Sequence, residues 1–138
     1  MNKEQMKKTL SILLFLLITA SCSNEVGNVE NPEIRSHSFL ESMYMDDYYP
    51  KNLVNKSKNV LIKLCVDIEH TNPSTTEELL NITHAATDQF NELMYEFQDQ
   101  GSDLETLARE AIASDIAFIL STYGYDIDIE DAIATREW

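Results

Sequence analysis

The stretch from Ser102 to Tyr123 constrains the fold most, because it reads as a helix that is apolar around most of its circumference. At 100° per residue its hydrophobic side chains fill a broad sector and leave only a narrow polar strip. Ser102 and Glu105 have the spacing of a capping box, and Gly124 can adopt the left-handed conformation that ends a helix. Neighbours normally cover such a helix on more than one side, so the sequence predicts a central, largely buried helix over about 103–123.

Asp115 lies in the middle of this apolar sector. A buried carboxylate is costly without partners, so we expect this one to be hydrogen-bonded. Two interpretations stay open. We favour a structural carboxylate that accepts hydrogen bonds from backbone amides or tyrosine hydroxyls, and the alternative is a polar cluster that lines a small pocket. The side chains considered as partners are Tyr44, Tyr48, Tyr49, His84 and Arg109, of which Arg109 projects well away from Asp115 on an ideal helix.

The N-terminal residues have the features of an export signal. Three lysines precede an apolar run over residues 10–20, which is too short for a membrane span of roughly 20 residues. The run ends in "TASC", which is similar to the lipobox of bacterial lipoproteins, with Thr19 in place of the usual Leu. The resemblance implies that residues 1–21 are a signal peptide and that Cys22 carries a lipid anchor. We therefore expect a bacterial envelope protein held at a membrane, and an ordinary secretory signal is the alternative.

The expected mature chain is strongly acidic. Removal of residues 1–21 leaves 7 basic and 23 acidic side chains, a net charge of −16. This charge argues against nucleic acid and against an anionic membrane surface as direct partners. It permits a basic protein partner, although solubility alone would also explain it. With Cys22 lipidated, Cys65 is left without a disulfide partner and reads as a small buried hydrophobe.

The rest of the chain predicts one helical domain. Residues 22–35 are polar and read as a flexible tether, and residues 36–138 form the domain. No stretch shows the alternation of a strand, so the fold class is all-α, a compact bundle of four to five helices. Besides the central helix, apolar stripes and breakers predict helices over 36–49, about 53–68, about 75–98 and a short one near the C-terminus.

Trp138, the last residue, is the only tryptophan. We expect a short terminal helix to dock Trp138 and Ile133 onto the bundle, with Arg136 reaching an acidic neighbour. The alternative is an exposed aromatic anchor for a partner.

Five strings of the sequence stand out together: "FLESMYMDDYYP" (39–50), "NLVNKSKNVLIKLC" (52–65), "THAATDQFNELMYEF" (83–97), "LETLAREAIASDIAFI" (104–119) and "IATREW" (133–138). With these strings the chain resembles an uncharacterised bacterial family, the domain of unknown function DUF5713. The resemblance covers roughly residues 36–138 and implies a small single domain, with no activity, cofactor or catalytic residue to carry over. Members generally look like proteins without a signal peptide, so the N-terminal leader is a departure from the family.

No catalytic or cofactor motif accompanies these features. The chain has no glycine-rich phosphate loop, nucleophile elbow or metalloprotease helix motif, so we expect no cofactor and no metal, and an enzyme is disfavoured. The sequence favours a non-catalytic protein-binding module, with an immunity-type protein that binds a basic toxin as one concrete form. The competing class is a small-ligand or enzymatic module with a pocket around Asp115 and the tyrosine-rich segment 44–49.

Overall fold

The computed structural model describes residues 28–138, so the expected signal peptide and Cys22 lie outside the described residues. The described chain is helical and contains no strand, which confirms the predicted all-α bundle. The helices are α2 (Pro32–Ser36), α3 (Glu41–Met45), α4 (Lys51–Thr71), α5 (Thr76–Asp99), α6 (Thr106–Thr122) and α7 (Ile129–Ala132).

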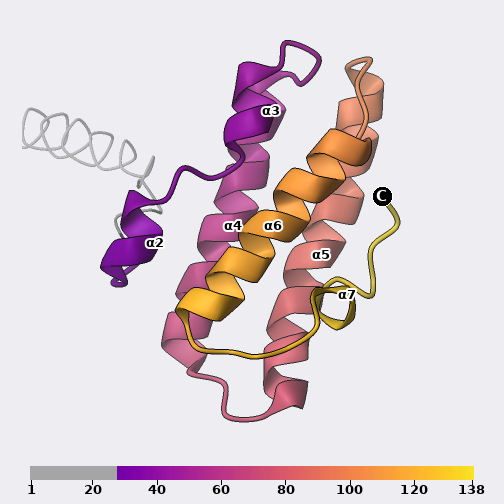
Figure 1. The fold of residues 1–138 in the computed structure, drawn as a ribbon. Helices are drawn as coiled ribbons and strands as arrows, with labels where there is room; N and C mark the ends of the chain where they lie inside the picture. Colours follow the sequence, from indigo (N-terminus) through magenta and orange to yellow (C-terminus); the bar gives the residue numbers. More distant parts are fainter. Residues whose placement is uncertain (1–27) are drawn as a thin grey trace, which may run out of the picture.

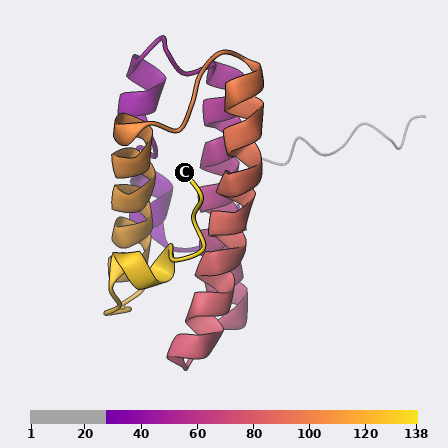
Figure 2. The same cartoon turned by 90° about the vertical axis from the view of Figure 1, so that its right-hand side faces the viewer.

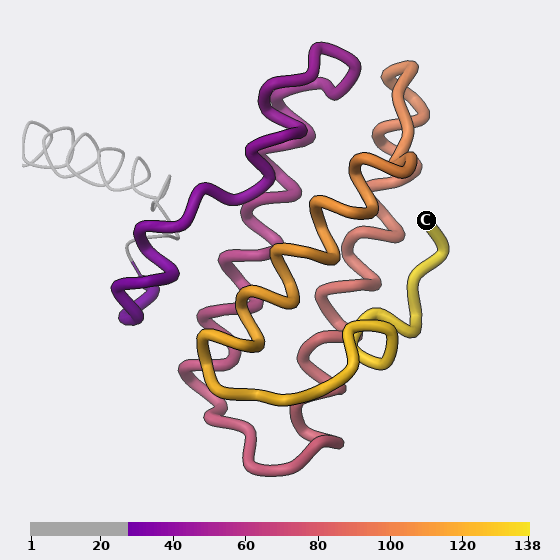
Figure 3. The backbone as a smooth tube through the Cα atoms, in the orientation of Figure 1, coloured from indigo at the N-terminus to yellow at the C-terminus, as the bar shows by residue number. Residues whose placement is uncertain are grey.

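The helices form two layers. Helices α4 and α5 make a long antiparallel hairpin, and α6 lies across its face (Figure 1). Seen from the side, the hairpin is one layer, and α2, α3, α6 and α7 make up the other (Figure 2). The α3–α4 and α5–α6 connections meet at one end, and the α4–α5 and α6–α7 connections lie at the opposite end (Figure 3).

Helix α6 is central, as predicted, because it packs against α2, α3, α4 and α7. Its inward side chains Ile112, Ile116 and Ile119 are fully buried. Apolar side chains of this size each contribute roughly 1.5–3 kcal/mol on burial, so this seam is a main source of stability. Leu107, in the first turn of α6, is an exception within the apolar sector and remains exposed.

The helix boundaries follow local chemistry at most ends. Thr75 and Glu78 form a capping box at the start of α5. Gly101 and Gly124 adopt left-handed conformations, with φ of +78° and +83°, just beyond α5 and α6. The start of α6 was expected near residue 103, but the helix begins at Thr106, since residues 102–105 run in an irregular connection that buries Leu104.

The helix predicted over residues 36–49 is broken. Ser36 ends α2, and of the following residues up to Tyr49 only Glu41–Met45 is helical, because Leu40 adopts a left-handed conformation with φ of +55°. The short helix ends at Met45, and Pro50 precedes the first turn of α4, where a proline needs no amide donor. Left-handed backbone is costly for leucine, so a tertiary contact must hold it.

The expected tether over 22–35 is also corrected in its described part. From Val29 onward the chain is packed on the bundle, with Val29 and Ile34 almost fully buried and α2 capped by Asn31. Polar composition predicted flexibility, but two apolar side chains and one cap are enough to dock this segment. Within residues 28–138, no helix combines the length and apolarity that a membrane span requires.

Candidate functional site

Asp115 is buried within α6, with 8% of its surface exposed, and its carboxylate is fully engaged. The backbone N–H of Leu40 donates to Oδ2 at 2.7 Å, and Nε2 of His37 donates to Oδ1 at 2.8 Å. The first bond supplies the tertiary contact that holds the left-handed Leu40 at the start of α3. Asp115 therefore ties the segment before α3 to the central helix.

His37 is fixed by its ring as well as by Asp115. It stacks on Phe118 with the ring centroids 3.9 Å apart, and it meets Phe39 edge to face at 4.6 Å. Stacking of this kind adds to the apolar contact and restricts rotation of the ring. The imidazole is thus held as a packing element beside a carboxylate, and the geometry favours the structural interpretation of Asp115.

The structure places the tyrosines considered as partners of Asp115 elsewhere. The Tyr44 hydroxyl donates to Asn55, and the Tyr48 hydroxyl donates to Glu105. Tyr49 is buried and packs edge to face against Phe97; burial is the main cause of its raised pKa. These rings serve contacts among α3, α4, α5 and the start of α6, so they line no common pocket with Asp115.

His84 and Arg109 are likewise apart from Asp115. Nε2 of His84 donates to the backbone carbonyl of Asp131 at 2.8 Å and so fastens α7 to α5. Arg109 is exposed in the second turn of α6. The predicted cluster is wrong in its membership, because the residues that reach Asp115 come from the segment before α3. Sequence reasoning missed His37, which stands 78 positions from Asp115, and no local pattern signals that contact.

A second junction, partly buried, centres on Glu69 near the end of α4. Its carboxylate accepts hydrogen bonds from the backbone N–H groups of Glu30 and Asn31, at 2.8 and 3.0 Å, and from the Tyr123 hydroxyl at 2.6 Å. Burial by itself would raise the pKa of Glu69, but these three donors outweigh it and the pKa is lowered. We call this set of contacts the Glu69 clasp, and it fixes the point where the N-terminal segment joins the bundle.

The clasp predicts an acid-dependent contribution to stability. A carboxylate with a lowered pKa stabilises the fold above its ordinary pKa, near 4.5, and loses that contribution as the pH falls through the lowered value. The stability difference between wild type and Glu69→Gln is therefore expected to be largest near neutral pH and to shrink below about pH 4.5. Urea unfolding at a series of pH values measures it. Tyr123→Phe, which removes one donor, should show a smaller change of the same sign, and a pH-independent difference would contradict the clasp.

Cys65 is fully buried in α4. Burial, with the nearby Glu69 carboxylate, raises the pKa of the thiol to about 12, so it stays protonated and inert. This agrees with its expected role as a small hydrophobe.

The C-terminal residues form a third junction, on α5. Trp138 is 8% exposed and meets Phe90 edge to face, with ring centroids 5.9 Å apart. Asn91 binds this segment twice, donating to the Thr135 carbonyl and accepting from the Glu137 N–H. The tail is docked, which confirms the expected packing of Trp138.

The expected pairing of Arg136 is confirmed as well. Its guanidinium lies 2.9 Å from the carboxylate of Glu130.

The acidic charge is concentrated in the second part of the chain. Residues 28–63 carry five acidic and five basic side chains, whereas residues 64–138 carry 17 acidic and two basic ones. The net charges are therefore zero and −15. Helices α5, α6 and α7 all belong to the second part, so the excess of negative charge lies on these helices and their connections.

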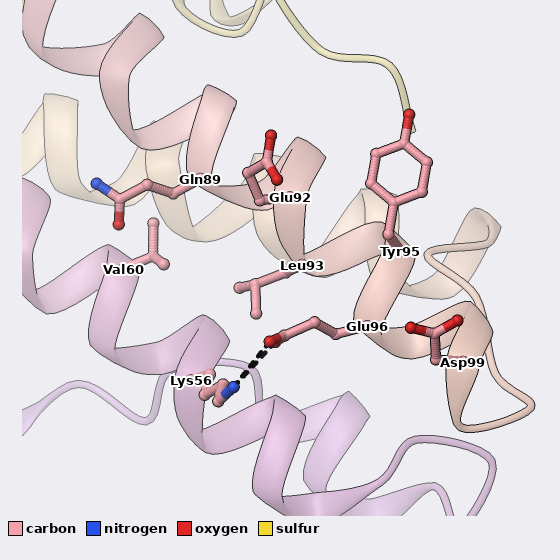
Figure 4. Close-up of a pocket in the computed structure, with 8 residues that line it drawn as sticks. All are labelled: Lys56, Val60, Gln89, Glu92, Leu93, Tyr95, Glu96 and Asp99. Carbon is pink, nitrogen blue, oxygen red and sulfur yellow. Dashed lines mark hydrogen bonds and ion pairs between the residues drawn. The ribbon is translucent and has the colours of Figure 1, made fainter.

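One open groove lies within this charged surface, between α4 and α5 (Figure 4). Its volume is about 460 Å³. Val60 and Leu93 supply apolar side chains between the helices, and a Lys56–Glu96 ion pair of 2.9 Å crosses from one helix to the other. The groove is lined by Lys56, Val60, Gln89, Glu92, Leu93, Tyr95, Glu96 and Asp99.

Two smaller hollows flank the loop after α6. One, of about 350 Å³, lies beside the end of α6, and one of about 150 Å³ lies between the loop and the start of α5. Asp115 lines none of these three hollows. Among the described residues, no group of three or more potential ligands is placed to hold a metal ion.

Comparison with known proteins gives a family and no activity. A family model described as "Family of unknown function (DUF5713)" matches residues 33–138. No curated protein and no solved structure gives a match.

Proposed function

Because the chain belongs to DUF5713, a family of unknown function, we infer its role from the surface that it presents, and we propose a non-catalytic module that binds a basic protein partner. The observation that carries this proposal is the uneven charge: residues 64–138 hold a net −15, and most of their acidic side chains lie on the surface of a small, well-packed bundle. An electrostatic potential that is negative over much of the surface accelerates association with a positively charged protein and disfavours negatively charged partners.

In this proposal Cys22 carries the lipid, and the domain works at a membrane of a bacterial envelope. The support is the leader sequence, with its lysines, short apolar run and "TASC" ending. An immunity-type protein that neutralises a basic toxin is one concrete form, supported by the small size, the acidic charge and the leader.

The competing function, a ligand or enzyme pocket around Asp115 and residues 44–49, lacks support from the contacts. Both oxygens of Asp115 are used by His37 and Leu40, and the tyrosines bond elsewhere. A catalytic carboxylate needs access to a substrate, and this one is enclosed.

The proposal is tested by capturing the protein from its own cells with an antibody against the domain, with washes at low and high salt. We expect one basic protein to be retained at low salt and released at high salt, because the Debye length falls from about 10 Å at 0.1 M to about 3 Å at 1 M. Recovery of no specific protein at either salt concentration would refute a charge-driven partner. Cys22→Ser, which leaves the domain unchanged, is expected to move the protein out of the membrane fraction.

A further inference from the structure

The large hydrophobic side chains that the described residues leave exposed gather at one end of the bundle. Met45 is 80% exposed, Tyr48 41% and Leu107 37%. The first two belong to the end of α3 and to the α3–α4 connection, and Leu107 lies in the first turn of α6, beside the α5–α6 connection (Figure 3). Tyr95, also exposed, stands one turn before the end of α5. Among the described residues, no large hydrophobic side chain is exposed at the opposite end, where the Glu69 clasp lies.

Two contacts show that the end of α3 lies against the start of α6. The backbone N–H of Leu40, just before α3, donates to Asp115 in the middle of α6. The hydroxyl of Tyr48, just after α3, donates to Glu105 at 3.0 Å, one residue before α6 begins. Helix α3 therefore runs antiparallel along the first half of α6, which brings Met45 toward the start of α6.

Leu107 projects from the side of α6 that faces α3. It stands four residues before Ala111 and eleven before Phe118, so these three side chains share one side of the helix. Phe118 stacks on His37, which belongs to the segment that leads into α3. The exposed side chains of α3 and α6 thus border one surface. We call the three exposed side chains of this surface the apical patch: Met45, Tyr48 and Leu107.

Tyr48 is held rigidly within the apical patch. Its ring meets the ring of the buried Tyr49 edge to face, with the centroids 5.0 Å apart. Its hydroxyl is bonded to Glu105, and its backbone N–H donates to the Asp46 carboxylate at 2.9 Å. A tyrosine that is already fixed loses little conformational entropy on binding, and tyrosines are enriched among the residues that dominate interfaces. Met45 adds a flexible, polarisable side chain that can adapt to a partner.

The charge around the apical patch selects the kind of partner. Residues 41–51 carry three acidic and one basic side chain, and residues 99–110 carry four acidic and one basic, a net charge of −5. The ammonium of Lys51 is turned onto the backbone carbonyls of Met43 and Asp46. A second copy of this chain would bring the same negative charge against the patch, as would an anionic lipid surface. A positively charged segment that also presents apolar side chains complements both properties of this surface.

We propose that the apical patch is the docking surface for the basic partner, which places an aliphatic side chain against Met45, Tyr48 and Leu107 and its lysine or arginine side chains over the surrounding carboxylates. This inference rests on the proposed function and adds to it a location and a ligand chemistry. Burial of the exposed apolar side chains supplies affinity, and the carboxylates supply attraction and orientation.

The experiment measures binding of a capped peptide in which leucine and lysine residues form an amphipathic helix. In a first control peptide serine replaces each leucine, and in a second glutamate replaces each lysine. Titration calorimetry and amide NMR shifts are recorded on the full chain carrying Cys22→Ser. Met45→Ser and Leu107→Ser are compared with Tyr95→Ser, a matched control that also removes one exposed apolar side chain but lies outside the patch. All three positions are exposed, and equal urea midpoints would show that the variants are folded alike.

We expect Met45→Ser to weaken binding of the leucine–lysine peptide about tenfold, Leu107→Ser about threefold, and Tyr95→Ser less than about twofold. The amide shifts should fall in residues 43–49 and 102–109, and both control peptides should bind at least about tenfold more weakly. Equal effects of Met45→Ser and Tyr95→Ser, or amide shifts at the α4–α5 loop end, would overturn the apical patch.

Two outcomes separate this inference from the proposed function. If the serine–lysine peptide bound as tightly as the leucine–lysine peptide, the apolar patch would be overturned and a purely charge-driven partner would stand. The capture from cells described above judges the proposed function separately, because its result does not depend on where the partner docks.

Discussion

Asp115→Ala is expected to lower the free energy of unfolding by about 3 kcal/mol, because it leaves the Leu40 amide and the His37 ring without their buried acceptor. Asp115→Asn keeps an oxygen for the Leu40 amide and should cost about half as much. Urea unfolding of both variants, with the exposed neighbour Ser114→Ala as control, measures the difference.

The relative free energies of unfolding of these three variants test the structural role of Asp115. The control should fall within about 0.5 kcal/mol of wild type. If both Asp115 variants were as stable as the control, the carboxylate would not hold the segment before α3. A loss of stability in Asp115→Ala with partial rescue in Asp115→Asn would identify the hydrogen bond to Leu40 as the main contribution.

Trp138→Ala is expected to destabilise the fold by about 3 kcal/mol, since it empties a buried site against Phe90 at the end of the chain. Trp138→Phe should cost less, about 1 kcal/mol, because it keeps an aromatic ring and the indole N–H has no acceptor among the described residues. Thermal and urea melts followed by circular dichroism compare the two.

Trp138 also reports on its own docking. Trp138 is the only tryptophan and is 8% exposed. Its fluorescence emission maximum should therefore lie at short wavelength in the native protein and shift to longer wavelength on unfolding. A native emission already typical of water-exposed indole would contradict the docked tail. The structure predicts that deletion of residues 133–138 lowers the free energy of unfolding by more than Trp138→Ala alone. If the tail were not docked, this deletion would leave the free energy of unfolding nearly unchanged.

The long helices could be predicted from the sequence because their signals are local. Apolar residues recur at helical spacing along α5, Thr75 and Glu78 form its cap, and glycines stand just beyond α5 and α6. The short helices α2 and α3 could not be predicted in this way. Helix α2 exists because Ile34 is buried and Asn31 caps it, and α3 starts at a left-handed Leu40 that depends on Asp115. Those contacts are tertiary, and the propensity of five residues does not reveal them.

The candidate site could likewise be predicted only in part from the sequence. Its polar residue, Asp115, could be recognised from the helical wheel alone, but its partner His37 could not, because that pairing depends on how α2 and α6 cross. The scarcity of positive charge after Lys63 is visible in the sequence. The groove between α4 and α5 is not visible in the sequence, because it depends on the register of the two helices, which places Lys56 opposite Glu96.

The Glu69 clasp has a consequence for where a lipid-anchored form of this protein could work. The clasp holds Glu30 and Asn31, and only residues 23–28 separate Cys22 from the buried Val29. The seven residue steps from Cys22 to Val29 span at most about 25 Å even when fully extended, which is less than the thickness of most folded domains. The bundle would therefore stay against the lipid surface with its α4–α5 loop end nearest the anchor, and a partner would have to approach along the membrane to meet it.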